Sequence, residues 1–427
     1  MKRSISFLIF FIVLFSSFSF ASHAADFTPD RDGANIESYY LYNVENNFYM
    51  AEHGVEKIIS PSATAKMMTA CIALNSDIDT SKIIAVNRDM LEGATGRTMK
   101  LKAGDRISVL DLLYATVCGG YNDAAQVLAY SVTGDVSKFV DLMNKKAAAL
   151  KMTATYYTNV TGLDDPQAFT CTLDVMKLAK HLLGNEDFLD IASTSSYKLS
   201  SSSSCERETI TNRSSLFASY RGIASFCTGS GDFGGCNVIF FKGKSLSFIS
   251  IVMGALPKDR DKDISCAESI SRQLIDHALY DYSYKTVMSE KTIVDSLPVL
   301  YSTDSEAELY LSGDLSVYIP SDVDEKTLTY NYYVYGDGLK APIKSGDEVG
   351  IMIVSYDGRT LTSIPLIVKE DVQKSAFLYF LESVKGYIKG PAFISTCIIF
   401  VCLMVGYYVY MKRMLRVVIH RSSNKRR

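Results

Sequence analysis

A run near the C-terminal end, 391–410, carries no charged side chain over twenty residues. Twenty residues of α-helix are enough to span the hydrocarbon core of a bilayer, so the run predicts a transmembrane helix. The tail that follows, 411–427, contains lysine and arginine but no acidic residue. By the positive-inside rule, this tail is expected in the cytoplasm. We therefore expect a single-pass protein of the cell membrane with an extracytoplasmic body.

The N-terminal end carries a second apolar run. Lys2 and Arg3 precede the apolar residues 5–20, and mostly small residues follow as far as Ala24. A basic start, an apolar stretch and a small-residue cleavage site are typical of a secretory signal peptide, here predicted as 1–24. The alternative is an uncleaved N-terminal anchor.

The chain between these ends has the composition of an ordinary globular protein. The full sequence has 427 residues, 48% of them hydrophobic and 21% charged, which is enough for two or three domains. A formal net charge of −3 gives no basic domain, so we expect no nucleic-acid partner. The cysteine and histidine spacings match no zinc site, and we expect no metal or organic cofactor. Disulfide pairing cannot be assigned from the sequence.

A helix is expected to begin at Ser60 and Pro61, because serine caps free backbone donors and proline suits the first turn. Residues three apart share one face of a helix, so a serine three residues before Lys66 would lie beside an amine that can take its proton. That position is Ala63, which has no hydroxyl. Ser62 is turned about 100° around the helix from it. We interpret Ser62 as a polar residue of the first turn, with a displaced nucleophile as the alternative.

The segment from Pro61 to Thr69 resembles the active-site helix of the D-alanyl-D-alanine carboxypeptidases, the low-molecular-mass penicillin-binding proteins. In that family the pattern reads roughly Pro-Ala-Ser-Leu-Thr-Lys-hydrophobic-Met-Thr, and the serine is the nucleophile. The serine position falls on Ala63. Lys66 is therefore retained without the group that it activates in the family.

Two further segments resemble the second and third motifs of the family. Asn122 matches the substrate-contacting asparagine of the family's Ser-x-Asn, but the serine position is Gly120. Cys227, Thr228 and Gly229 stand where the family has Lys-Thr-Gly, on an edge strand that holds the substrate carboxylate. A cysteine of ordinary pKa supplies no positive charge at neutral pH.

The resemblance implies an α/β penicillin-binding, transpeptidase-like domain with a central antiparallel sheet, which we place at 30–282. Short strands separated by turn signals predict a small all-β domain at 283–370. The expected strands of that domain are 292–299, 307–311, 315–319, 328–334 and 348–354. A helical connector, 371–390, is expected to lead into the transmembrane helix.

Three motif residues with chemical roles are replaced, by Ala63, Gly120 and Cys227. Three replacements on an otherwise matching frame favour a pseudoenzyme that binds peptidoglycan stem peptides or a cell-envelope protein. The alternative is an active serine-type D-Ala-D-Ala carboxypeptidase that trims peptidoglycan pentapeptides through Ser62 and Lys66. The candidate site residues are Lys66 and Asn122 in the catalytic positions, with Cys227, Thr228 and Gly229 in the substrate-binding positions.

Overall fold

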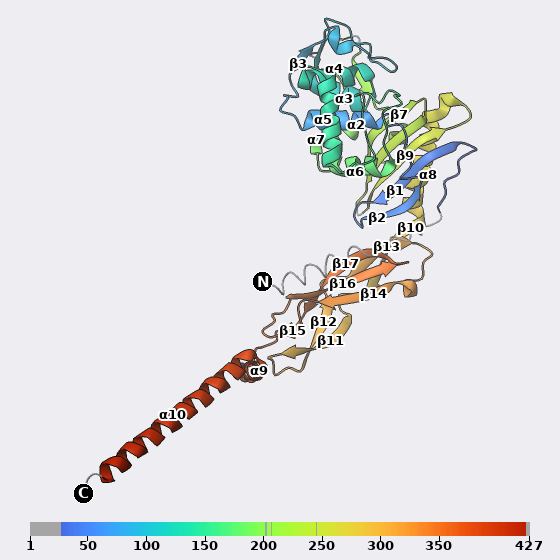
Figure 1. The fold of residues 1–427 in the computed structure, drawn as a ribbon. Helices are drawn as coiled ribbons and strands as arrows, with labels where there is room; N and C mark the ends of the chain where they lie inside the picture. Colours follow the sequence, from blue (N-terminus) through green and yellow to red (C-terminus); the bar gives the residue numbers. More distant parts are fainter. Residues whose placement is uncertain (1–26, 201–202, 206, 245, 424–427) are drawn as a thin grey trace. The chain divides into compact units, whose positions relative to one another are not determined.

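The computed structural model describes residues 27–423, apart from 201–202, 206 and 245 (Figure 1). The predicted signal peptide lies outside the described residues. The chain forms two compact units. The first holds the described residues up to Ser283 together with Ile319–Asp322, and the second holds Tyr284–Tyr318 and the chain from Val323 onward.

The first unit is built on one antiparallel sheet of five strands. In spatial order they are β2 (Phe48–His53), β1 (Asn35–Asn43), β9 (Ser247–Leu256), β8 (Gly234–Lys242) and β7 (Ile223–Gly231). Strands β1 and β2 form an antiparallel hairpin at the start of this unit. Strands β7, β8 and β9 are buried along most of their length, so they form the centre of the hydrophobic core.

Helices gather beside β7 and on the sheet (Figure 1). They are α2 (Thr64–Leu74), α3 (Val109–Val117), α4 (Asn122–Thr133), α5 (Val136–Ala149), α6 (Thr172–Leu182) and α7 (Glu186–Ala192). Helix α8 (Asp263–Asp276) packs on β8 and β9 and continues into the π-helical turn η4 (His277–Asp281). The short elements are β3 (Ile83–Ala85), η1 (Asp89–Leu91), β4 (Arg106–Ser108), β5 (Ser196–Lys198), β6 (Thr209–Thr211), η2 (Ser215–Ala218) and η3 (Arg260–Lys262).

Helix α2 begins later than the sequence predicts. Its first residue is Thr64 and its N-cap is Ala63, so the expected start at Ser60 is wrong. The Ser60 hydroxyl instead donates to the Asp164 carboxylate at 3.0 Å. Ser62 adopts a left-handed backbone with φ of 46°, which separates the Pro61 turn from the helix. Most of α2 is buried, as its apolar sequence predicts.

A buried carboxylate fixes the chain that follows β5. Asp111, in the first turn of α3, accepts a hydrogen bond from the Tyr197 hydroxyl at 2.8 Å and from the Ser200 hydroxyl at 2.8 Å. It also accepts from the hydroxyl of Ser203. Asp111 is fully buried, so these donors supply the hydrogen bonds that water would otherwise give to its charge.

The second unit contains a six-stranded sheet and most of a separate two-stranded pair, β10 (Tyr282–Met288) with β13 (Leu315–Pro320). The order in the larger sheet is β14 (Thr329–Val334), β16 (Glu348–Tyr356), β17 (Arg359–Val368), β12 (Glu306–Leu311), β11 (Ile293–Leu300) and β15 (Leu339–Lys340). The 3₁₀ turn η5 (Glu325–Thr327) precedes β14. All five expected strands are confirmed, while β10, β15 and β17 were not predicted.

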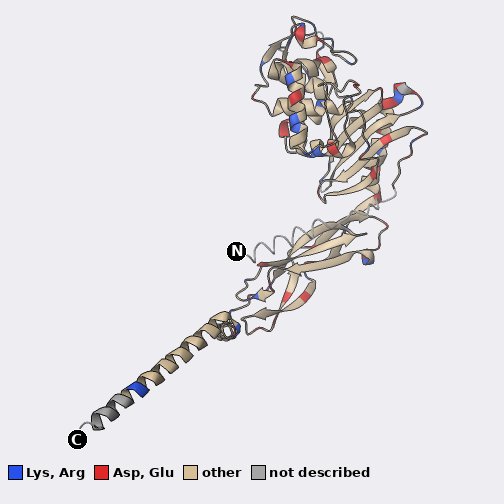
Figure 2. Cartoon of the chain, in the orientation of Figure 1, with Lys and Arg blue, Asp and Glu red and all other residues tan. Residues whose placement is uncertain are grey.

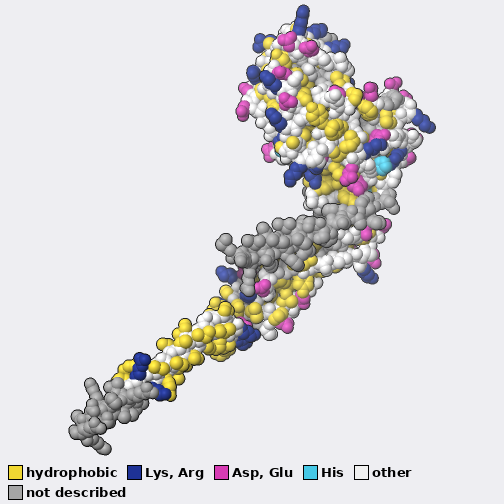
Figure 3. All heavy atoms as spheres, in the orientation of Figure 1, with side chains coloured by type: hydrophobic (Ala, Val, Ile, Leu, Met, Phe, Trp, Pro, Cys, Tyr) yellow, Lys and Arg dark blue, Asp and Glu magenta, His cyan; other side chains and the backbone are white. Residues whose placement is uncertain are grey.

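The chain ends in two helices, α9 (Ala376–Lys389) and α10 (Pro391–Ser423). Pro391–Met414 is long and apolar enough to cross a membrane, and none of its most apolar window is buried against protein. Figure 3 shows its surface as almost continuously hydrophobic, and Figure 2 shows the first basic residues only toward its end. The C-terminal helix therefore has the character expected of a membrane anchor.

Candidate active site

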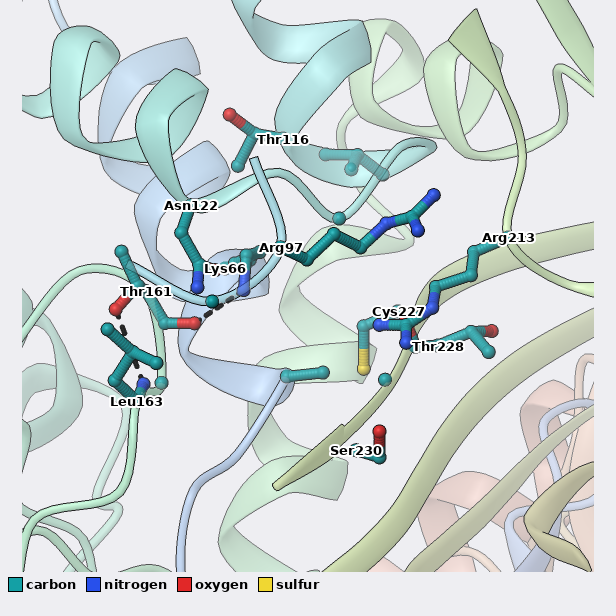
Figure 4. Close-up of a pocket in the computed structure, with 16 residues that line it drawn as sticks. Lys66, Arg97, Thr116, Asn122, Thr161, Leu163, Arg213, Cys227, Thr228 and Ser230 are labelled. Atoms are coloured by element: carbon teal, nitrogen blue, oxygen red, sulfur yellow. Dashed lines mark hydrogen bonds between the residues drawn. The ribbon is translucent and has the colours of Figure 1, made fainter. Parts of the chain in front are cut away.

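A cavity of about 220 Å³ lies in the first unit, where six parts of the chain meet (Figure 4). These parts are the start of α2, the loop 96–97, the end of α3 with its connection to α4, the loop 161–163, the segment at Arg213 and strand β7. The cavity brings together the residues at all the motif positions singled out in the sequence, namely Ala63, Lys66, Gly120, Asn122, Cys227, Thr228 and Gly229. Ser62 is not among the described residues that line it.

Lys66 reaches the cavity from the first turn of α2. Its ammonium group donates a hydrogen bond to the carbonyl oxygen of Thr161 at 2.5 Å, and the residue is only 8% exposed. Burial lowers the pKa of Lys66 to about 8, and the nearby charge of Arg213 acts in the same direction. An amine with this pKa exchanges a proton readily near neutral pH, which is the property that a general base needs.

Ala63, three residues before Lys66, carries a methyl group and no hydroxyl. Ala63 is the N-cap of α2 and lies against β7, since a Cβ built on Gly229 would be 2.6 Å from the Ala63 Cβ. Ser62, one residue earlier, is 6% exposed. Its carbonyl oxygen lies so close to Gly162 that a Cβ there would be at 1.7 Å. The chain around positions 62 and 63 is thus held tightly on both sides.

The second motif, with Gly120 and Asn122, contributes backbone groups and an amide to the cavity wall and no hydroxyl. Gly120 has a φ of 65°, a left-handed conformation that suits glycine. Asn122 begins α4, and its side-chain amide donates to the carbonyl oxygen of Thr95 at 2.7 Å. Its backbone N–H donates to the carbonyl oxygen of Arg97, also at 2.7 Å. Asn122 therefore ties the loop that contains Arg97 to the cavity wall.

The third motif provides a thiol that stays neutral. Cys227 is 3% exposed, and burial raises its pKa well above the usual value, with the adjacent Cys236 thiol adding to the rise. A neutral thiol is a weak nucleophile. All nine cysteines of the chain lie within the described residues and are free of disulfides.

Thr228 keeps the identity of the family residue, but its hydroxyl is directed away from the cavity (Figure 4). It donates to the side-chain oxygen of Asn237 at 2.8 Å and lies 3.1 Å from the Ser225 hydroxyl. Asn237 in turn donates to Ser271 in α8 at 3.0 Å. The Thr228 side chain thus belongs to a buried polar chain that joins β7, β8 and α8.

Two arginines in the cavity wall were not predicted from the sequence. Arg97 is exposed at the mouth and Arg213 is half-buried. Both stand in loops without periodic pattern, and they come together only through the fold, so no local sequence signal identifies them. No group of three or more histidine, cysteine, aspartate or glutamate side chains that could hold a metal ion occurs in the described part of the chain.

The antiparallel sheet, the buried helix that carries Lys66 and the adjoining strand β7 define a domain of the penicillin-binding type, followed by a β domain. A sequence model of the D-alanyl-D-alanine carboxypeptidase family matches residues 27–256. A model of the C-terminal domain of penicillin-binding protein 5 matches residues 282–374. The chain belongs to the D-alanyl-D-alanine carboxypeptidase family, whose members act on peptidoglycan.

Named relatives cover nearly the whole chain. The D-alanyl-D-alanine carboxypeptidase DacF of Bacillus subtilis is 24% identical over 394 residues, which are 90% of this chain and 98% of the relative. DacC of Escherichia coli is 27% identical over 380 residues, 86% of this chain and 91% of the relative. The crystal structure of penicillin-binding protein 5 from Haemophilus influenzae superimposes with a TM-score of 0.60 at 21% identity, covering 82% of this chain and all of that one.

Proposed function

We propose that this protein is a pseudoenzyme that binds peptidoglycan stem peptides in the cavity without cleaving them. The observation that carries the proposal is Ala63. It occupies the helix position beside Lys66 where the family has its serine, and it offers a methyl group in place of a hydroxyl. Loss of the nucleophile in a serine hydrolase lowers kcat by on the order of a millionfold.

The other two replacements support the same conclusion. Gly120 supplies no hydroxyl to relay a proton, and Cys227 supplies no positive charge to a substrate carboxylate. The lysine that remains donates to the Thr161 carbonyl, so its ammonium is anchored in the cavity wall. Ala63 and Gly120 replace groups that act in bond cleavage, and Cys227 replaces a group that binds the substrate carboxylate, while the cavity between them is retained.

The apolar helix and the basic tail support a location of the body at the cell surface. The apolar helix α10 anchors the protein in the membrane, the basic tail lies in the cytoplasm and the two units face the cell wall. A peptidoglycan peptide is then the ligand within reach of the cavity, and a cell-envelope protein is the alternative partner.

The competing function is carboxypeptidase activity through a displaced serine. It requires the Ser62 hydroxyl to approach both Lys66 and the substrate. The left-handed backbone of Ser62 and its burial outside the described cavity lining favour the binding role instead.

Intact-mass spectrometry of the full-length protein in detergent, after incubation with a penicillin, separates the two functions. We expect no mass gain while thermal melting shows a folded protein. An active family member treated in parallel shows that the drug is competent. A stable gain of one drug molecule would contradict the pseudoenzyme proposal, and peptide mapping would name the residue that carries it.

A further inference from the structure

Arg97 is held at the mouth of the cavity by contacts that leave the end of its guanidinium group available. Its Nε donates to the carbonyl oxygen of Gly119 at 2.8 Å. Its Cζ lies 4.8 Å from the centre of the Tyr121 ring, within the range of a cation–π interaction. The backbone of Arg97 is fixed by Asn122, as described above. The side chain is therefore ordered before any ligand binds, which reduces the entropic cost of using it.

Arg213 enters the cavity from another segment, just before η2 (Figure 4). Its backbone N–H donates to the carbonyl oxygen of Cys118 at 2.9 Å, and its Nη1 lies 3.5 Å from the carbonyl oxygen of Thr228. Burial lowers the pKa of Arg213 to about 10, and the positive charge of Arg97 adds to the effect. The two guanidinium groups line the same cavity and so add their positive charges there.

Positive charge runs from the mouth of the cavity to its interior. Arg97 is exposed, Arg213 is half-buried and Lys66 is buried. Among the described residues that line the cavity there is no aspartate or glutamate. Glu268 acts on Arg213 electrostatically, but its carboxylate accepts from the backbone N–H and the hydroxyl of Ser215, at 2.7 and 2.5 Å. A ligand with one negative charge would leave most of the positive charge of these three side chains without a counter-charge.

We infer that the cavity selects a dianionic ligand, namely a peptide whose C-terminal residue carries a second carboxylate on its side chain. Arg213 and Lys66 bind the inner carboxylate, and Arg97 binds the outer one at the mouth. A guanidinium group can donate two parallel hydrogen bonds to a carboxylate, which adds direction to the charge attraction. The inference rests on the proposed binding function and adds a preference to it.

The test compares three peptides on the full-length protein in detergent micelles by isothermal titration calorimetry. The peptides are acetyl-D-Ala-D-Glu, its near-isosteric neutral-side-chain partner acetyl-D-Ala-D-Gln, and acetyl-D-Ala-D-Ala. Because Arg97 is exposed, its contribution is that of a surface ion pair, and we expect the D-Glu peptide to bind about fivefold more tightly than the D-Gln peptide. Equal affinities for these two peptides would overturn the inference.

Variants assign the preference to Arg97. In Arg97→Gln we expect the D-Glu and D-Gln peptides to bind within about twofold of each other. Arg88→Gln removes an exposed arginine outside the cavity lining and should keep the preference. A preference that survives Arg97→Gln would contradict the assignment.

The outcomes also separate this inference from the proposed function. Binding of all three peptides with equal affinity leaves the binding function standing and removes the dianion preference. Absence of binding by all three, with melting curves that show a folded protein, contradicts both.

Discussion

The Cβ of Ala63 lies where a side chain on Gly229 would have to stand, so the start of α2 and strand β7 approach each other closely at the cavity. A side chain on Gly229 would place its Cβ 2.6 Å from that of Ala63. The nucleophile position and the third motif are thus joined by packing in this protein. This contact leads to the first of four predictions.

Gly229→Ala should destabilise the first unit, because strand β7 or helix α2 must move to relieve the overlap. Overpacking of a tight site costs about 1–3 kcal/mol of unfolding free energy. Denaturant unfolding followed by circular dichroism measures this loss, since the chain has no tryptophan for fluorescence. Gly184→Ala is the matched control, since its new Cβ would meet only the His181 carbonyl oxygen at 3.5 Å. Equal stability of the two variants would show that the contact at 229 is not tight.

Ala63→Ser should restore slow acylation by a fluorescent penicillin. The new hydroxyl would stand on α2 three residues before Lys66, whose pKa of about 8 suits it to accept a proton. Adding Lys66→Met in the same background should lower the rate by roughly 10²–10⁴-fold, as expected for loss of a general base. Adding Ser62→Ala should leave the rate unchanged. Failure of Ala63→Ser to react would mean that Lys66 is not placed to activate it.

Lys66 should make stability depend on pH. Its pKa is lowered in the folded protein, so above about pH 8 the folded state binds fewer protons than the unfolded state. The free energy of unfolding of the wild type, relative to Lys66→Met, should therefore rise between about pH 8 and 10.5 by on the order of 2–3 kcal/mol. It should stay level between about pH 6 and 7.5, where Lys66 is charged in both states. A level difference across the whole range would show that the amine is not buried.

Asp111→Asn should loosen the chain that follows β5. Burial raises the pKa of this carboxyl, but hydrogen bonds from Ser203, Ser200 and Tyr197 outweigh it, so the pKa lies below the usual value. The amide would place donors against these donors, at a loss of about 1–3 kcal/mol in unfolding free energy near neutral pH.

Urea unfolding measures this loss, with the exposed Asp141→Asn as control, expected within about 0.5 kcal/mol of the wild type. Because the folded pKa of Asp111 is depressed, its stabilising effect is present above the unfolded pKa and disappears as pH falls through the folded value. A difference from the variant that grows on acidification would contradict this assignment.

The fold class of the first domain could be predicted because three segments resemble the motifs of a known family, and that of the second because short strands alternate with turn signals. Lys66 could be placed on a helix from local pattern, Cys227 was placed on a strand through the family resemblance, and the structure brings both to one cavity. Strand β17 escaped prediction because Pro365 interrupts its pattern. Strand β15 has only two residues, Leu339 and Lys340, which is too short for any period.

The remaining details depend on contacts between distant segments. Ser60 is a residue type that often caps helices. Its hydroxyl instead donates a hydrogen bond to Asp164, far along the chain, and the helix starts at Thr64. Arg97 and Arg213 are 116 residues apart in the sequence, and neither stands in a recognisable motif. Such groupings are set by tertiary structure, so sequence patterns cannot reveal them.

The hydroxyl of Thr228 has a structural role. Its hydroxyl secures Asn237, which secures Ser271, so the residue holds two strands and a helix in place. A substitution at this position is expected to lower the stability of the fold, whether or not the protein hydrolyses a peptide. A threonine at this position therefore does not by itself indicate catalytic activity, because its hydroxyl has a structural role in the fold.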